Sequence, residues 1–278
     1  MVNTPSPLRY PGGKTILYDK VKKIIGKNIE KNCTYIEPFA GGCGLALKLL
    51  FNEDVGNIII NDYDYAIFCI WDAILNNTQE FISNIKNIEV TLDEWKKQHE
   101  IYENKEEYSN LQIAVATLFL NRTNVSGVIK GGPIGGFTQS GKYKIDCRFN
   151  KDTIIKKIQK IAAYKDKIKL YNLEANDFIK DIIPNINNIT FTYLDPPYIQ
   201  KGPSLYKNFF NEDDHRILAS TVLNNLKDNK WIITYDNNKL VQEMYRNCKL
   251  EVFDLPYSAG NTKIGKEIMI YSNKVTKL

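Results

Sequence analysis

The sequence predicts an α/β fold that is interrupted by a helical, basic insertion. β-rich runs alternate with helical patterns in the first 75 residues and again after residue 164, as is typical of a mainly parallel sheet. Residues 76–164 instead show helical periodicity and carry most of the excess positive charge. We therefore predict an α/β domain formed by residues 1–75 and 165–278, with a second domain inserted at 76–164.

Each element is predicted from its own local pattern. Runs of β-branched and aromatic residues predict strands at 33–39, 57–62, 168–173, 189–194, 231–236, 250–257 and 267–272. Helical patterns occupy 42–51, 91–102, 111–122, 151–163, 175–183 and 212–227. Thr91 and Glu94 have the spacing of a capping box, which marks the start of the second of these helices.

The positive charge of the chain is concentrated in one stretch. The net charge is +5, yet residues 121–170 carry twelve Lys or Arg against three Asp, so the remainder is slightly acidic. The same stretch holds six of the sixteen glycines, between Gly127 and Gly141. A basic, glycine-rich loop that binds phosphates is the interpretation we favour, and a solvated lysine-rich helix is the alternative.

The composition argues against a membrane protein, a metal site and catalysis that depends on histidine. The sequence has no apolar run of the roughly 20 residues that a membrane span needs and no apolar core of a signal peptide near its start, so we expect a cytoplasmic protein. Its five cysteines are scattered without a CxxC pair, which makes a metal site improbable. The only histidines are His99 and His215, so catalysis by a histidine-activated nucleophile has few candidates.

A glycine turn between the first strand and the first helix predicts a cofactor site. Glu37-Pro38-Phe39-Ala40-Gly41-Gly42-Cys43-Gly44 lets backbone approach a ligand closely at a helix N-terminus. Asp62, at the end of the second strand, is placed to accept hydrogen bonds from a ribose. Together they indicate a nucleoside-containing cofactor. Asp177 is either a hydrogen-bond acceptor for a purine amine or a helix N-cap.

The stretch TFTYLDPPY at 190–198 predicts a second ligand site. Pro196 and Pro197 end the strand because neither can donate to a sheet ladder, so Asp195 comes to lie at its carboxyl end, where open α/β sheets hold ligands. The Asp195 carboxylate, a proline carbonyl and the Tyr198 ring could together hold a planar group that bears an NH2. A second glycine turn, RYPGGK at 9–14, lacks the GK[ST] of a phosphate loop and does not predict ATP binding.

Taken in order, RYPGGK, EPFAGGCG, NDYD, LNR (120–122) and DPPY resemble the motifs of Dam-type, alpha-group DNA adenine-N6 methyltransferases. The resemblance spans nearly the whole chain. It implies a Rossmann-like fold with a mixed seven-stranded sheet, helices on both faces and a helical target-recognition insertion at 76–164. It also implies that the chain is an enzyme that transfers a methyl group from S-adenosylmethionine to N6 of a flipped-out adenine in a short sequence of double-stranded DNA.

Site residues follow from the same motifs. The resemblance implies a catalytic loop made of Asp195, Pro196, Pro197 and Tyr198. It implies that the cofactor is surrounded by Tyr10, Lys14, Glu37, Phe39, Gly41, Asp62, Asp177 and Phe178. It implies DNA contacts from Arg9, Asn121, Arg122, Val125, Ser126, Lys130, Lys142 and Lys207. No metal is implied. A cognate restriction endonuclease is among the partners that fit, and we expect a monomer.

One departure from the resemblance concerns the recognised sequence. Relatives that recognise GATC place a tyrosine and an asparagine after LNR, whereas Val125 and Ser126 stand here, so the sequence does not predict GATC. Either an aliphatic wedge enters the base stack, or Phe137 or another residue replaces the ring. Two rival functions remain at this point: a methyltransferase for RNA or a protein amide, and a non-catalytic DNA-binding module. Asp rather than Asn at 195 argues against the amide, and the presence of Asp195, the glycine turn and Asp62 argues against the second.

Overall fold

The computed structural model describes residues 4–10, 12–29, 32–199, 210–257 and 263–278, and it divides into two compact units. The sheet unit consists of Lys14–Tyr63 and Tyr171–Leu278. The helical unit consists of Met1–Gly13 and Asp64–Leu170. The helical unit therefore takes in residues 1–13, 64–75 and 165–170 in addition to the segment 76–164 that we set apart from the sequence.

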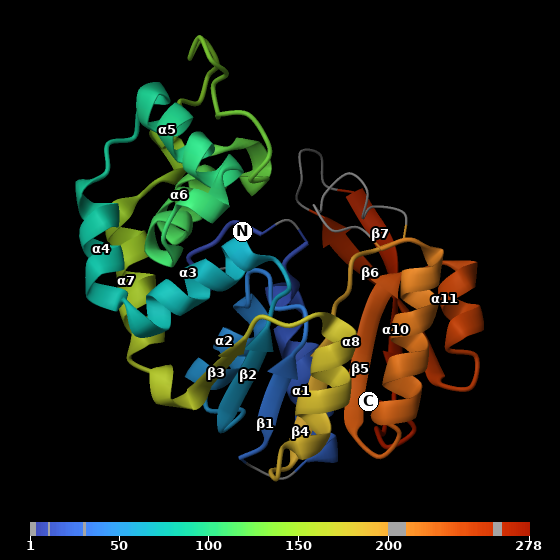
Figure 1. Ribbon diagram of the computed structural model, residues 1–278. Helices are drawn as coiled ribbons and strands as arrows, with labels where there is room; N and C mark the ends of the chain where they lie inside the picture. The colour runs from blue at the N-terminus through green and yellow to red at the C-terminus, as the bar shows by residue number, and fades with distance from the viewer. Residues whose placement is uncertain (1–3, 11, 30–31, 200–209, 258–262) are drawn as a thin grey trace. The chain divides into compact units, whose positions relative to one another are not determined.

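A mixed seven-stranded sheet forms the framework (Figure 1). Its strands, in chain order, are β1 (Thr34–Glu37), β2 (Asn57–Asn61), β3 (Ile168–Tyr171), β4 (Thr190–Leu194), β5 (Lys230–Asp236), β6 (Lys249–Tyr257) and β7 (Lys263–Tyr271). In space the order is β3-β2-β1-β4-β5-β7-β6. β1, β2, β4 and β5 pair in parallel, whereas β7 runs antiparallel between β5 and β6. The predicted mixed seven-stranded α/β fold is confirmed.

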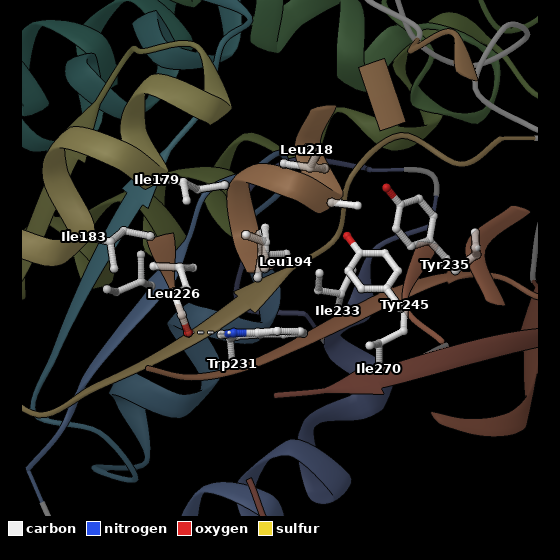
Figure 2. Close-up of a cluster of buried hydrophobic side chains, with 14 of the residues drawn as sticks. Ile179, Ile183, Leu194, Leu218, Leu226, Trp231, Ile233, Tyr235, Tyr245 and Ile270 are labelled. Atoms are coloured by element: carbon white, nitrogen blue, oxygen red, sulfur yellow. Dashed lines mark hydrogen bonds between the residues drawn. The ribbon is translucent and has the colours of Figure 1, made fainter. Parts of the chain in front are cut away.

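One face of the sheet is closed by a large apolar core (Figure 2). Leu194 of β4 and Ile233 of β5 meet Leu218 of α10 (Glu212–Asn225) and Ile179, which follows the short helix α8 (Ala175–Asp177). The indole nitrogen of Trp231 donates to the Leu226 carbonyl at 3.1 Å, so the one polar atom of this ring is satisfied inside the core (Figure 2). All five β4 residues are buried, as expected for a central parallel strand.

Helices on both faces of the sheet complete the sheet unit. α1 (Tyr18–Asn28) and α2 (Gly44–Phe51) lie behind the sheet, while α10 and α11 (Lys239–Met244) lie in front of it (Figure 1). α1 and α11 were not predicted from the sequence. The strands were, to within a few residues at each end, because burial on both faces leaves near-continuous apolar runs.

The helical unit contains α3 (Tyr65–Asn76), α4 (Thr78–Asn87), α5 (Leu92–Glu103), α6 (Asn110–Thr123) and α7 (Lys151–Ala162). α6 is buried over nearly its whole length, from Ile113 to Asn121. Ser109 forms a capping box with Gln112 at its start. At α5 only half of the predicted box is present: the Thr91 hydroxyl accepts from the Glu94 amide.

The glycine-rich segment after α6 is a succession of turns and 3-10 helices, so its interpretation as a loop is confirmed. The Gln139 side chain links several parts of this segment by hydrogen bonds. The Gln139 side chain donates to the carbonyls of Ile134 and Gly136 and accepts from the Ile145 amide. Its own backbone is left-handed, at φ 51°.

Within the described part of the chain, no helix is long and apolar enough to cross a membrane. The described residues also contain no group of three His, Cys, Asp or Glu side chains that could hold a metal ion. All five cysteines carry free thiols.

Candidate active site

Asp195 lies directly after β4 with its carboxylate held on both oxygens. The Lys14 ammonium donates to Oδ2 at 2.9 Å, and the Thr234 hydroxyl donates to Oδ1, also at 2.9 Å. Lys14 is 6% exposed at its side chain and Asp195 22%, so the ion pair is shielded while the carboxylate keeps an open side. A carboxylate has about four lone-pair sites, so both oxygens can accept one further hydrogen each.

Thr234 is a contact of Asp195 that was not foreseen from the sequence. It lies on β5, whose parallel pairing with β4 sets Ile233 opposite Leu194. Tyr193 lies within 2.7 Å of the Thr234 hydroxyl, oxygen to oxygen. Because Thr234 spends its one hydrogen on the carboxylate, Tyr193 must donate to Thr234. The chain Tyr193–Thr234–Asp195 fixes the rotation of the carboxylate.

These two hydrogen bonds of Thr234 predict the effect of replacing it. The change Thr234→Val keeps the shape but removes the donor to Oδ1 and strands the buried Tyr193 hydroxyl. We expect turnover to fall about tenfold, the equivalent of one hydrogen bond of ~1.4 kcal/mol. Thr234→Ser restores the hydroxyl and is expected to recover most of the rate. Equal single-turnover rates for the two variants would remove Thr234 from the positioning of Asp195.

Glu37 is a second carboxyl group near Asp195, and it is almost fully buried. It lies at the end of β1, where the Tyr35 hydroxyl donates to Oε1 at 3.0 Å. Burial raises the pKa of Glu37 to about 8, and the negative charge of Asp195 adds to the rise. Glu37 therefore holds its proton at neutral pH, unless a cation approaches it.

The raised pKa predicts a pH-dependent stability. Between the ordinary value of 4.5 and about 8, the folded chain keeps the Glu37 proton that the unfolded chain loses. The free energy of unfolding should thus fall as pH rises through this window, because the unfolded state binds fewer protons. Glu37→Gln is expected to flatten this part of the curve. Urea unfolding of both proteins at several pH values measures it, and parallel curves would contradict the assignment.

The glycine turn and Asp62 lie together at the carboxyl ends of β1 and β2. The Gly41 amide donates to the Asp62 carboxylate at 2.7 Å, and Gly41 has a left-handed φ of 44° that a residue without a side chain adopts freely. The Asn172 side chain donates to the Asp62 carbonyl at 2.6 Å and fixes its backbone. A partly exposed carboxylate beside bare backbone fits the hydroxyls of a ribose, which donate to it.

Other predicted site residues of the sheet unit differ in their surroundings. Tyr198 is only 9% exposed, and the Lys14 ammonium lies 4.8 Å from its ring centre, so this face of the ring is covered. Burial raises the pKa of Tyr198 well above its usual value. Phe39 is half-buried, with its ring edge-on to Phe210 at 6.2 Å. Pro196 is buried and Pro197 half-buried.

Asp177 and Phe178, two neighbouring residues that the motifs assign to the cofactor, have opposite environments. Phe178 is fully buried in the core, with its ring 5.4 Å from Tyr171. Asp177 is exposed. The helix N-cap is Glu174, whose carboxylate accepts from the amides of Asn176 and Asp177, so the N-cap alternative for Asp177 is wrong.

In the helical unit, Asn121 joins three chain segments. Its side chain accepts from the Arg9 amide at 2.8 Å and donates to the carbonyls of Arg9 and Gly127, each at 2.9 Å. At 1% exposure, its amide group is committed to backbone. Tyr10, a predicted cofactor residue, also belongs to this unit and accepts from the Gly13 amide.

The remaining predicted DNA-contacting residues of this unit lie around the glycine-rich loop. Val125, Ser126, Lys130 and Lys142 are all exposed, and Ser126 is left-handed at φ 57°. Lys207 lies outside the described residues. Phe137, the alternative wedge, is 63% exposed, although its edge meets Trp95 at 5.4 Å.

Comparison with known families decides the class of the protein. Residues 10–259 match the model of the D12 class N6 adenine-specific DNA methyltransferases. The chain belongs to this family. As a D12 methyltransferase it is an adenine-specific enzyme with DNA as its substrate, and the predicted cofactor, S-adenosylmethionine, is confirmed with the class. The rival functions as an RNA or protein-amide methyltransferase, or as a non-catalytic binding module, do not hold.

Two individual relatives agree with this family. A type II methyltransferase, M.MjaIII of Methanocaldococcus jannaschii, is 25% identical over 76% of this chain and 77% of its own. The retron Ec67 DNA adenine methylase of Escherichia coli is 23% identical over 95% of this chain and 90% of its own. Among solved structures, the rRNA methyltransferase AviRa of Streptomyces viridochromogenes is 10% identical, with a TM-score of 0.43 over 95% of this chain and 87% of that one.

Proposed function

We propose that this D12 methyltransferase methylates N6 of an adenine that is flipped out of a short sequence in double-stranded DNA, and that Asp195 accepts hydrogen bonds from the reacting amine. The observation that carries the proposal is the Asp195 carboxylate, fixed by Lys14 and Thr234 at the carboxyl end of β4 with lone pairs to spare.

The chemistry of adenine explains why such a carboxylate is needed. The exocyclic nitrogen is a poor nucleophile because its lone pair is delocalised into the ring. When Asp195 and the Pro196 carbonyl accept its two hydrogens, the nitrogen is drawn toward tetrahedral geometry, and the positive charge that grows on it is stabilised. S-adenosylmethionine supplies an electrophilic methyl group on its sulfonium. Gly41, Asp62 and Glu37 are the residues that we assign to hold it.

Lys14 fixes the orientation of the Asp195 carboxylate. Its ammonium, 2.9 Å from Oδ2, stabilises the charged carboxylate and orients it. With Oδ2 held by Lys14 and Oδ1 by Thr234, the carboxylate presents its remaining lone pairs as hydrogen-bond acceptors. We therefore assign Lys14 as a positioning residue as well as a neighbour of the cofactor.

An adenine inside a duplex can reach Asp195 only if it leaves the base stack, which costs roughly a few kcal/mol. We assign DNA recognition to the predicted insertion 76–164 with Arg9, because its positive charge suits the phosphate backbone. Exposed Val125 or Phe137 is the proposed wedge. Tyr198 is proposed to stack on the base, for which its ring must exchange the contact with Lys14.

Three finer proposals concern the setting of the reaction. A cognate restriction endonuclease is proposed because a type II methyltransferase is among the relatives. A monomer is proposed because one chain supplies Lys14, Glu37, Asp195 and Thr234. A DNA substrate supports a cytoplasmic location.

The experiment that tests the proposal is transfer of a radiolabelled methyl group from S-adenosylmethionine. Unmethylated duplex DNA, its heat-separated strands and total RNA are offered at equal mass, and the products are digested to nucleosides. We expect labelled N6-methyl-2′-deoxyadenosine from the duplex. A stronger signal from the separated strands would overturn the base-flipping step, and label in RNA alone would overturn the proposal.

A further inference from the structure

We propose that Arg148 and Lys157, together with Arg9 and Arg122, form a binding site for a phosphate of the DNA backbone. These four residues are called the basic cluster below. The inference rests on the proposed function, since it takes duplex DNA as the ligand. The sequence motifs singled out Arg9 and Arg122 but gave no role to Arg148 or Lys157.

The helical unit brings the four side chains together from separate parts of the chain. Arg122 lies in the last turn of α6 and Lys157 lies on α7. The Arg122 guanidinium donates to the Pro7 carbonyl at 3.4 Å, and the Lys157 ammonium donates to the Ser6 carbonyl at 2.9 Å. These two carbonyls belong to consecutive residues, and the charge of Arg122 acts on Lys157, so the two cationic groups are neighbours.

Arg9 and Arg148 complete the cluster. The Arg9 guanidinium donates to the Asn124 carbonyl at 3.1 Å, just beyond the end of α6. Arg148, at the end of the 3-10 helix Ile145–Arg148, is exposed and close enough to repel both Arg9 and Arg122. Arg9, Arg122 and Lys157 are thus fixed by neutral carbonyls, and Arg148 leaves the cluster open to solvent.

In the described part of the chain, none of the four side chains of the cluster forms an ion pair with a carboxylate. Burial, and then the charges of Arg9 and Arg148, lower the pKa of Arg122 to about 10. Burial, followed by the charge of Arg122, also lowers the pKa of Lys157. Cations held together against their mutual repulsion indicate a site for an anion.

The free donors of Arg122 indicate what kind of anion fits. Its Nε is buried and has no hydrogen-bond partner among the described residues. A guanidinium fork with a free Nε–H matches the paired oxygens of a phosphodiester, and adjacent ammonium and guanidinium groups add to its binding. Since all four cations share the helical unit, where we placed DNA recognition, a backbone phosphate is the ligand of choice.

The test compares variants that each lack one positive charge, either on the 3-10 helix Ile145–Arg148 or on α7. Arg148→Ala removes an exposed side chain that forms no hydrogen bond with the described residues, and Lys157→Met keeps the apolar stem of the lysine. Lys156→Ala is the matched control, because Lys156 is the exposed neighbour of Lys157 on α7 and carries the same charge. The affinity for a fluorescein-labelled, unmethylated duplex is measured at several salt concentrations.

One lost phosphate contact should reduce the slope of log K against log salt by about 0.9. We expect this change for Arg148→Ala and for Lys157→Met, with at least ~3-fold weaker binding at physiological salt, and an unchanged slope for Lys156→Ala. Wild-type slopes in both cluster variants would overturn the site, as would an equal loss in the control.

Methyl transfer by the same proteins separates this proposal from the proposed function. If the wild type methylates duplex DNA while the slopes stay unchanged, the phosphate site is wrong and the function stands. If the wild type transfers no methyl group to duplex DNA, the function itself falls, and the phosphate site falls with it.

Discussion

Replacement of Asp195 by alanine is expected to abolish methyl transfer while binding of S-adenosylmethionine and DNA persists. The change removes the acceptor for the amine hydrogens, and electrostatic groups of this kind contribute about 10²–10³ in rate. Single-turnover transfer to duplex DNA measures the loss, and calorimetric titration of the cofactor shows that its site survives. Retention of more than about a tenth of the wild-type rate would exclude the assigned role, because a loss that small is one hydrogen bond's worth.

The ion pair with Lys14 requires a control for stability. Lys14 is 6% exposed at its side chain, so Asp195→Ala leaves a nearly buried ammonium without its carboxylate, at a cost of about 3–5 kcal/mol. The double change Lys14→Met, Asp195→Ala removes both charges and should be the more stable of the two proteins in urea. If inactivity came from unfolding alone, this double variant would regain activity; we expect it to remain inactive.

Gly127→Ala is expected to destabilise the helical unit by about 2–4 kcal/mol and to weaken DNA binding. Gly127 has φ +78°, and an added Cβ would lie 2.3 Å from the Arg9 carbonyl oxygen. Both partners of this approach are also hydrogen-bonded by Asn121, so neither can move without breaking a buried contact. Urea unfolding and duplex affinity measure the two effects.

Two other glycines in the same loop separate the causes. Gly136 has φ +74° but no atom within 4 Å of an added Cβ, so Gly136→Ala should cost only the ~1 kcal/mol of a left-handed backbone. Gly132 has neither restriction, and Gly132→Ala should be close to neutral. Equal stabilities of Gly127→Ala and Gly136→Ala would show that the approach of Arg9 to Gly127 is not tight.

The sheet and the position of Asp195 at the end of a strand were predictable because their signals are local. β4 combines an apolar run with two prolines that stop it, and this alone places Asp195 at the end of a strand. α1 escaped notice although Val21, Ile24 and Ile25 have helical spacing, because its lysine-rich outer face follows a glycine turn and resembles a loop in composition.

Contacts between segments that are distant in the sequence could not be predicted from local patterns. Thr234 reaches Asp195 only through the register of β5 against β4, which no local pattern encodes. The basic cluster joins residues 9, 122, 148 and 157, and two of its three carbonyl partners, Ser6 and Pro7, lie more than a hundred residues away from the cations that they bind. Phe178 matched a motif, yet it packs in the core because its side chain faces the sheet.

The most direct test of the account is single-molecule sequencing of DNA from a methylation-deficient host that expresses this chain, with Asp195→Ala as the control. The account predicts N6-methyladenine at one short sequence with the wild type and none with the variant. Unmarked DNA from the wild-type strain, or the same marks from both strains, would contradict it.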